Sequence, residues 1–301
     1  MPLNALYDLP APAKLNLFLH VVGRRTDGYH LLQSVFTLID WADTLHLERR
    51  TDGRLLRHDL GLALPPEDLC LKAARALQTE SGCTLGADIS ITKEVPWGAG
   101  LGGGSSDAAT VLIGLNRLWD LNWSSERLLA LGERLGADVP FFIGGRTAFV
   151  EGIGERLTPV TMTPQHYAVL KPTAAIPTAG IFSSPLLTRD TAAAIVTGFL
   201  ADAKALVQRE VGGAESLAGF AGHNDLQRAA EALCPEVAEV GRWLQARFGN
   251  SRMTGSGSAV YARAGAGERP VATMHEGEWP EGWVGRMCRS LDAHPLAGWL
   301  G

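Results

Sequence analysis

Cysteine is scarce in the 301-residue chain, which has only Cys70, Cys83, Cys234 and Cys288. No two of them form a Cys-x-x-Cys pair, the spacing that is typical of zinc sites and redox motifs. Four scattered thiols also lack the pattern of a disulfide-rich secreted domain. We therefore expect reduced, mostly buried thiols, and neither a disulfide framework nor a zinc site.

Long hydrophobic runs are also missing. No stretch reaches the roughly 18 consecutive apolar residues that a membrane span requires. The first ten residues, MPLNALYDLP, have neither the basic nor the apolar segment of a secretory leader. The sequence therefore predicts a soluble, cytoplasmic protein that does not bind a membrane.

Neither sign of charge is in large excess, because 27 basic and 32 acidic residues give a formal net charge of −5. Binding to a nucleic acid backbone or an anionic membrane surface requires a broad basic surface. The length and the 46% hydrophobic content suit one large core or two modest ones. We predict two domains and a small-molecule substrate, without a nucleic acid partner, and leave monomer and homodimer as alternatives.

Hydrophobic periodicity predicts an α+β fold with separate strands and helices rather than regular βαβ alternation. Strand patterns cover residues 13–22, 44–48 and 88–95, and helical patterns cover 69–77, 108–118, 191–211 and 225–248. Turn chemistry at 23–28 predicts a strand, a loop and a second strand at the start of the chain. A Pro-, Thr- and Ala-rich stretch at 162–185 suggests domains at 1–160 and 161–301, and residues 265–283 are predicted to be loop.

The strongest local signal is a glycine-rich loop, PWGAGLGGGSS, between a predicted strand and a predicted helix. Five glycines among residues 98–104 leave backbone N–H groups bare enough to wrap an anion. A helix N-terminus adds about 0.3–1 kcal/mol for a negative ligand, and Ser105 or Ser106 is expected to cap that helix. The predicted phosphate-binding residues are Pro96, Trp97, Gly98, Ala99, Gly100, Leu101, Gly102, Gly103, Gly104, Ser105 and Ser106.

Three other interpretations of this loop are weaker. Gly98, Gly100 and Gly103 match a dinucleotide fingerprint, and Asp120 lies near the spacing of its ribose acid. However, the preceding strand alternates and carries charge, whereas a fingerprint strand is apolar throughout. The loop lacks the Lys-Ser or Lys-Thr of a P-loop, and a simple tight turn requires one or two glycines, not five.

Three separated segments together resemble the GHMP kinase superfamily, which includes galactokinase and the homoserine, mevalonate and phosphomevalonate kinases. They are residues 12–19 (PAKLNLFL), the glycine-rich loop, and residues 252–261 (RMTGSGSAVY). The resemblance implies a ribosomal protein S5 domain 2-like ATP-binding domain followed by a ferredoxin-like α/β sandwich. It also implies an active site in the cleft between them, with ATP and Mg²⁺ as cofactors.

Residues 23–36, 137–142 and 224–226 resemble one branch of the superfamily, whose acceptor is a cytidine diphosphate-linked polyol. The combined resemblance runs from Pro12 to about Leu291. It implies transfer of the γ-phosphoryl group of ATP to a hydroxyl of that polyol, in isoprenoid synthesis. Asp68 departs from the pattern, since the family more often has Asn there, so contacts with the adenosine half of ATP are not carried over.

The resemblance implies that Asp138 is the catalytic base and that Lys14 pairs with it. A carboxylate beside the acceptor hydroxyl can take its proton, and a buried ammonium needs a partner and can stabilise phosphoryl charge. From the residues alone, Asp138 is explained equally well as the cap of a helix. Lys14 can likewise be a lysine that extends from a strand end to solvent.

The remaining predicted site residues rest mostly on the resemblance. Aromatic faces can stack on a pyrimidine, and imidazole can hydrogen-bond its edge. Without their sequence context, these side chains would be ordinary turn, surface and core residues. The predicted substrate-binding residues are Asn16, Tyr29, His30, Asp138 and Phe182; Thr254, Gly255 and Gly257 are predicted to shape the cleft, and Ser106 to meet phosphate and Mg²⁺ or simply cap the helix.

Two alternatives stay open on the sequence. Another superfamily kinase would phosphorylate homoserine, a sugar or mevalonate, although residues 27–30 (DGYH) argue against it. A nucleotide-binding sensor of the same fold would bind ATP without turnover, although the presence of both Lys14 and Asp138 argues against that. No role is predicted for Trp279, Trp283 or Trp299.

Overall fold

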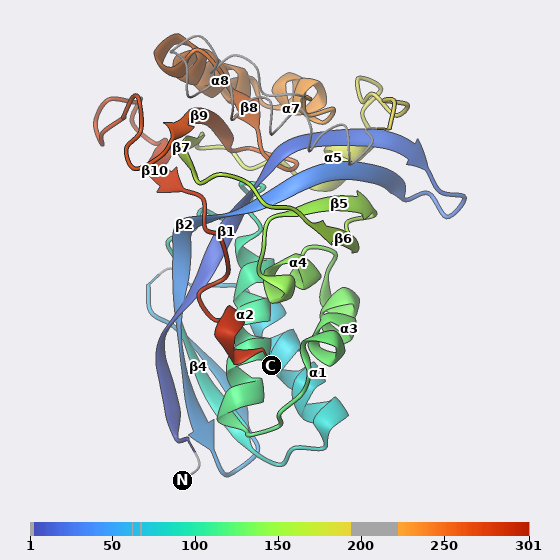
Figure 1. Cartoon of the computed structure of the whole chain (residues 1–301), viewed down its shortest axis with the longest axis vertical. Coiled ribbons are helices and arrows are strands. Elements are labelled where there is room, and N and C mark those ends of the chain that lie inside the picture. The colour runs from blue at the N-terminus through green and yellow to red at the C-terminus, as the bar shows by residue number, and fades with distance from the viewer. Residues whose placement is uncertain (1–2, 62, 67, 194–221, 301) are drawn as a thin grey trace.

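The computed structural model describes residues 3–61, 63–66, 68–193 and 222–300, which form two sheets with packed helices (Figure 1). The strands of the first sheet are β1 (Ala5–Arg24), β2 (His30–Arg50), β3 (Leu55–Asp59), β4 (Gly86–Thr92), β5 (Ala148–Gly152) and β6 (Arg156–Pro159). They lie in the order β3-β4-β2-β5-β6, and β1 pairs with β2. The two long strands extend from the lower part of the molecule to the upper part.

The predicted opening of strand, loop and strand is confirmed, although β1 is longer than predicted. It begins at Ala5 because Leu9 and Ala11 are buried in the core beneath the helices. The strand patterns at 44–48 and 88–95 fall in β2 and β4, which pair antiparallel with Thr44 opposite Thr92 and Glu48 opposite Asp88. The sequence did not predict β3, which pairs in parallel with β4 at the edge of the sheet.

Four helices pack against the first sheet (Figure 1): α1 (Leu69–Ser81), α2 (Gly103–Leu118), α3 (Ser125–Leu135) and α4 (Val139–Gly144). The predictions of α1 and α2 are confirmed. The Asp68 carboxylate caps α1 by accepting from Leu71 N at 3.0 Å. The prediction that Ser105 or Ser106 caps α2 is wrong, because α2 begins earlier and both serines lie inside it; the cap position is Gly102.

The second sheet consists of β7 (Gln165–Lys171), β8 (Arg252–Met253), β9 (Val260–Ala266) and β10 (Val284–Arg289). Its order is β10-β7-β9-β8 with antiparallel neighbours, as expected of a ferredoxin-like sandwich. Its helices are α5 (Thr178–Phe182), α7 (Gln227–Leu233) and α8 (Pro235–Phe248).

Of two helical predictions in this half, one differs from the structure and the other falls mostly outside the described residues. The helix predicted over 225–248 is two helices, because the chain breaks at Cys234 and Pro235 starts α8, where its missing N–H costs nothing. The helix predicted over 191–211 lies outside the described residues from 194 onward. The predicted loop at 265–283 is confirmed for residues 267–283, which contain neither helix nor strand, whereas residues 265 and 266 belong to β9.

The chain passes from the first sheet to the second between β6 and β7, near the predicted boundary at residue 160. It later returns: Leu291 N donates to Leu38 O at 2.9 Å, and a 3₁₀ turn (Ala297–Trp299) follows. The Trp299 ring lies 4.7 Å from the Arg117 guanidinium of α2, which gives this tryptophan a packing role. The division at 160 therefore stays a prediction, since the C-terminal residues pack on the first sheet's helices.

Trp279 and Trp283 lie in the loop before β10 and pack against the core of the second sheet. The Trp279 indole N–H donates to Trp283 O at 3.2 Å, so the pair closes the loop on itself. The prediction of mostly buried thiols is confirmed, since three of the four free cysteines are buried. Within the described part of the chain, no helix is both long and apolar enough to span a bilayer.

Candidate active site

The glycine-rich loop joins β4 to α2 and lines a cavity of about 650 Å³. Gly98, Gly100 and Gly102 have φ values of 63°, 73° and 73°, a conformation that side chains other than glycine rarely adopt. The loop therefore exposes backbone N–H groups directly before the N-terminus of α2. This arrangement is the one expected of a phosphate-binding loop.

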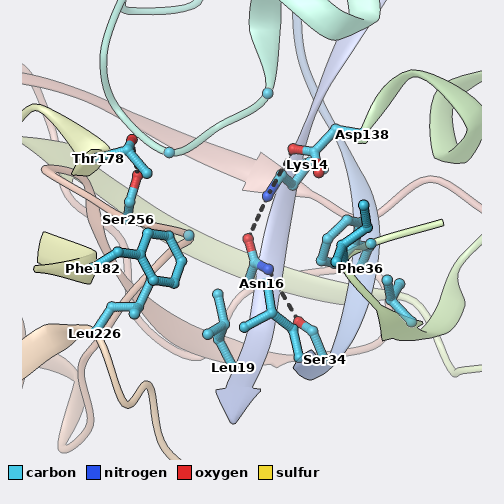
Figure 2. A pocket seen from close by; sticks show the side chains of 17 residues that line it. Lys14, Asn16, Leu19, Ser34, Phe36, Asp138, Thr178, Phe182, Leu226 and Ser256 are labelled. Carbon is cyan, nitrogen blue, oxygen red and sulfur yellow. Dashed lines mark hydrogen bonds and ion pairs between the residues drawn. The ribbon is translucent and has the colours of Figure 1, made fainter. Parts of the chain in front are cut away.

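A second cavity, of about 170 Å³, adjoins the first (Figure 2). Both cavities are lined by Gly100, Gly102 and Thr178, so they meet at the glycine-rich loop. The second cavity is also lined by Lys14 and Asp138, together with Asn16, Phe36 and Phe182. An anion held by the loop would therefore end beside the Lys14–Asp138 pair.

Lys14 and Asp138 form the predicted ion pair, with Lys14 Nζ 3.5 Å from Asp138 Oδ2. Lys14 is only 3% exposed, and its ammonium also donates to Asn16 Oδ1 and lies 4.3 Å from the centre of the Phe36 ring (Figure 2). Burial lowers the pKa of Lys14, and Asp138 partly opposes that shift. The lysine is thus fixed in place by neighbours that require its charge.

Asp138 stands at the cap position of α4, but its carboxylate makes no capping hydrogen bond. The alternative explanation of Asp138 as a side-chain cap therefore has no support in the structure. The carboxylate side chain is 30% exposed, and the first five residues of α4 are buried. A rigid helix start thus holds a partly exposed carboxylate at the wall of the smaller cavity.

Asn16 links the two halves of the site. Its Nδ2 donates to Ser34 Oγ at 3.0 Å, and its backbone N–H donates to Thr254 Oγ1 at 2.9 Å. Ser34 was not predicted as a site residue, because a lone serine in a strand carries no sequence signal. The predicted cleft residue Thr254 is fully buried.

The C-terminal glycine-rich turn packs directly on the phosphate loop. Ser258 N donates to Gly98 O at 3.2 Å, and Ala259 N donates to Ala99 O at 3.1 Å. A Cβ on Gly255 would lie 2.8 Å from Gly100 O, so no larger residue fits there without displacing the loop. The predicted turn residues Thr254, Gly255 and Gly257 thus support the loop.

The structure brings His30 and Phe182 together, with ring centroids 5.0 Å apart and an interplanar angle of 26°. Phe182 lines the smaller cavity, whereas Tyr29 and His30 are not among its lining residues. Tyr29 lies in the β1–β2 hairpin and is 62% exposed. To stack on a pyrimidine as predicted, Tyr29 would therefore have to contact it from the rim of the smaller cavity.

Ser106 faces away from both cavities. Its side chain is fully buried, and its hydroxyl donates to Pro12 O at 2.7 Å. Ser105 is the serine that lines the larger cavity. The role of Ser106 toward phosphate and Mg²⁺ stays a prediction, and in this conformation its hydroxyl is used to fasten α2 to β1.

A buried charged cluster beneath the loop was not predicted. Lys93 Nζ pairs with Asp43 Oδ2 and lies 2.5 Å from Asp107 Oδ2. Burial and the nearby Asp43 raise the pKa of Asp107 to about 8, although Lys93 acts in the opposite direction. Burial acts to lower the pKa of Lys93, but Asp107 and Asp43 have the larger combined effect, so the pKa is raised. The raised pKa leaves Asp107 largely protonated at neutral pH, so the Lys93 ammonium balances the Asp43 carboxylate and also holds the Asp107 side chain at the start of α2.

Replacing Lys93 with methionine is expected to lower the free energy of unfolding by about 3–5 kcal/mol, because the buried Asp43 carboxylate and the Asp107 carboxyl group lose their only described cation. The measurement is urea unfolding of the variant and the wild type. Asp107→Asn alone should cost much less, since the Lys93–Asp43 pair remains. The double variant should be more stable than Lys93→Met; a double variant that is no more stable would contradict this account.

The position of Asp120 argues against the dinucleotide interpretation. Asp120 follows the C-terminal end of α2, whose 16 residues span about 24 Å. It is therefore a helix length away from the loop and cannot bind a ribose next to it. The strand before the loop is also antiparallel to its central neighbour β2, unlike a strand of a doubly wound parallel sheet.

Comparison with known proteins now places the chain in a class. Residues 68–146 match the GHMP kinases N terminal domain, and residues 202–270 match the GHMP kinases C terminal domain. The two-sheet fold, the phosphate loop and the adjoining Lys–Asp pair agree with that match. The chain belongs to the GHMP kinase family.

Comparison with individual relatives narrows the similarity to particular kinases. The chain is 65% identical, over the full length of both chains, to a protein of Methylibium petroleiphilum named 4-diphosphocytidyl-2-C-methyl-D-erythritol kinase. A crystal structure of 4-(cytidine 5'-diphospho)-2C-methyl-D-erythritol kinase is 37% identical, with a TM-score of 0.71 over 85% of this chain and 90% of that one. Homoserine kinase from Cytophaga hutchinsonii is 14% identical, with a TM-score of 0.63 over 97% and 96%, and shares the fold.

Proposed function

We propose that this protein transfers the γ-phosphoryl group of ATP to the 2-hydroxyl of 4-diphosphocytidyl-2-C-methyl-D-erythritol, giving the 2-phosphate and ADP. This reaction is a cytoplasmic step of the methylerythritol phosphate route to isoprenoids. The observation that carries the proposal is the junction of the two cavities at Gly100 and Gly102, beside Lys14 and Asp138. The names of the full-length relatives support the choice of acceptor.

Each side chain at the junction has a role in this reaction. The loop and the N-terminus of α2 hold the phosphates, and the smaller cavity holds the polyol. Asp138 accepts the proton of the attacking hydroxyl as the phosphoryl group transfers. Lys14 stabilises negative charge on the transferring group, and Asn16 binds a substrate hydroxyl. Positioning by these groups can supply roughly 7–11 kcal/mol of the barrier.

Mg²⁺ is part of the proposal, since it neutralises the phosphates of ATP during transfer. Among the described lining residues of the larger cavity, Ser105 and Asp107 offer oxygen ligands, whereas the two Asp68 oxygens already contact Leu71 N and the Arg57 guanidinium. Asp107 Oδ1 is buried and makes no hydrogen bond. Mg²⁺ is usually bound through one or two carboxylates and the substrate phosphates, so Asp107 would hold it once the metal displaced its proton, with Ser105 as a second oxygen ligand.

The test is ADP release from MgATP, measured with 4-diphosphocytidyl-2-C-methyl-D-erythritol and with 2-C-methyl-D-erythritol 4-phosphate, which lacks the cytidylyl group. Turnover that requires the cytidylyl group supports the proposal. Homoserine, galactose and mevalonate are the comparison acceptors. Activity with one of these instead would leave the kinase class standing and reject the acceptor, and ATP binding without turnover on any acceptor would favour a sensor.

A further inference from the structure

Arg189 makes an unusual set of contacts next to the predicted nucleobase-binding residues. Its Nη2 donates to Phe182 O at 3.0 Å and to Ser184 O at 2.9 Å, and its Nη1 donates to Leu187 O at 3.1 Å. Its Nε donates to His30 Nε2 at 3.3 Å. A single half-buried guanidinium therefore binds three carbonyls and one imidazole.

These contacts join two parts of the molecule. Phe182 ends α5, and the carbonyls at a helix C-terminus have no partner within the helix. Arg189 supplies that partner, as basic residues commonly do at helix ends. His30 begins β2, on the long hairpin of the first sheet. Arg189 thus connects the end of α5 to the hairpin at the point where the His30 and Phe182 rings stack.

The contact with His30 also determines its protonation. Arginine can only donate, so His30 Nε2 must accept, and the ring hydrogen of the neutral imidazole is on Nδ1. Burial, followed by Arg189 and Arg24, lowers the pKa of His30. No carboxylate contributes to that shift among the described groups. The histidine is therefore held neutral, with one defined donor.

We infer that Arg189 is a positioning residue for the nucleobase end of the substrate. It caps the carbonyls around Phe182 and holds His30 as a neutral ring parallel to the Phe182 ring, so that the two rings form a fixed wall. The inference rests on the proposed function, because that function brings a cytidylyl group to these residues. Arg189 itself acts through His30 and Phe182 and takes no part in phosphoryl transfer.

The wild type, Arg189→Ala, Arg189→Lys and the exposed control Arg242→Ala are compared in steady-state kinetics with 4-diphosphocytidyl-2-C-methyl-D-erythritol and MgATP. Arg189→Ala is expected to raise KM for the cytidylyl acceptor by about tenfold or more, since it loses four hydrogen bonds. Its kcat and its KM for ATP should change by less than about twofold. Arg242→Ala, on the outer face of α8, should match the wild type.

A pH profile separates this role from a structural one. Removing the Arg189 charge raises the pKa of His30, so the acid limb of kcat/KM for the acceptor should move to higher pH in Arg189→Ala. Arg189→Lys keeps the charge but not the planar fork, so it should keep the wild-type acid limb and recover only part of KM.

Three results would overturn the inference in different ways. A wild-type KM and pH profile in Arg189→Ala would reject Arg189 while leaving the proposed function intact. A lower kcat, a higher KM for ATP and a lower melting temperature, all in Arg189→Ala, would mean that Arg189 supports the fold in general. Absence of cytidylyl-dependent turnover in the wild type would reject the proposed function itself.

Discussion

Replacing Asp138 with asparagine is expected to lower kcat for phosphoryl transfer by roughly 10²- to 10⁴-fold, the usual contribution of a general base. Asparagine keeps the shape of the side chain but cannot accept the hydroxyl proton. Asparagine also leaves the buried Lys14 ammonium without its counter-charge, so the free energy of unfolding should fall by about 1–3 kcal/mol, although the carboxylate caps nothing. ADP release and urea unfolding of the same variant measure both quantities.

Asp120→Asn is the matched control for this variant. Asp120 has φ 55°, which asparagine also tolerates, and it lies at the far end of α2 from the loop. It should leave kcat unchanged. If Asp138→Asn kept full activity, the catalytic base would have to be another group. If it kept full activity and lost only stability, Asp138 would serve only as the partner of Lys14.

Replacing Gly100 with alanine is expected to be nearly as damaging, for a steric reason. A Cβ at this position would lie 2.3 Å from Thr254 O and 3.0 Å from Gly257 N, and the backbone has φ +73°. The left-handed conformation costs about 1–2 kcal/mol and overpacking typically a further 1–3 kcal/mol. We therefore expect a loss of about 2–5 kcal/mol in unfolding free energy. A phosphate loop displaced by 1 Å should also lose about 10²-fold in activity.

Gly249→Ala separates the two costs. Gly249 caps α8 with φ +71°, but no atom lies within 4 Å of the position of its Cβ. Gly249→Ala should therefore lose only the conformational part of the unfolding free energy, about 1–2 kcal/mol, and keep full activity. Equal destabilisation of the two variants would show that the contact between Gly100 and the C-terminal turn has little importance.

The fold was predictable where local pattern decides it. The alternation in β4 and the helical spacing in α1 and α2 depend only on which faces are buried, so these elements were predicted correctly. Strand partners were not predictable, because the pairing of β3 with β4 is decided by packing across the sheet. The cap of α2 was predicted incorrectly. A serine was expected to cap the helix with its hydroxyl, but the cap position is Gly102, whose left-handed backbone needs no side chain.

The site was predictable where a buried residue would be unfavourable without a specific partner. Lys14 in a buried strand required a counter-charge, and that pair was found. Arg189 was missed, since its partner His30 is 159 positions away in the sequence. Lys93 was noticed only as a charge that disfavours a fingerprint strand. Its partner Asp43, 50 positions away, could not be identified without the fold.

The hydrogen bond between Asn16 and Thr254 joins positions 238 residues apart in the chain. Contacts of such sequence separation form late, because loop closure is costly before it is rewarded. During synthesis, the first strand leaves the ribosome long before residue 254 exists. The N-terminal part of the growing chain therefore carries Lys14 and the phosphate loop without the C-terminal turn that supports them. Competence to bind both substrates is thus postponed until almost the whole polypeptide has been made.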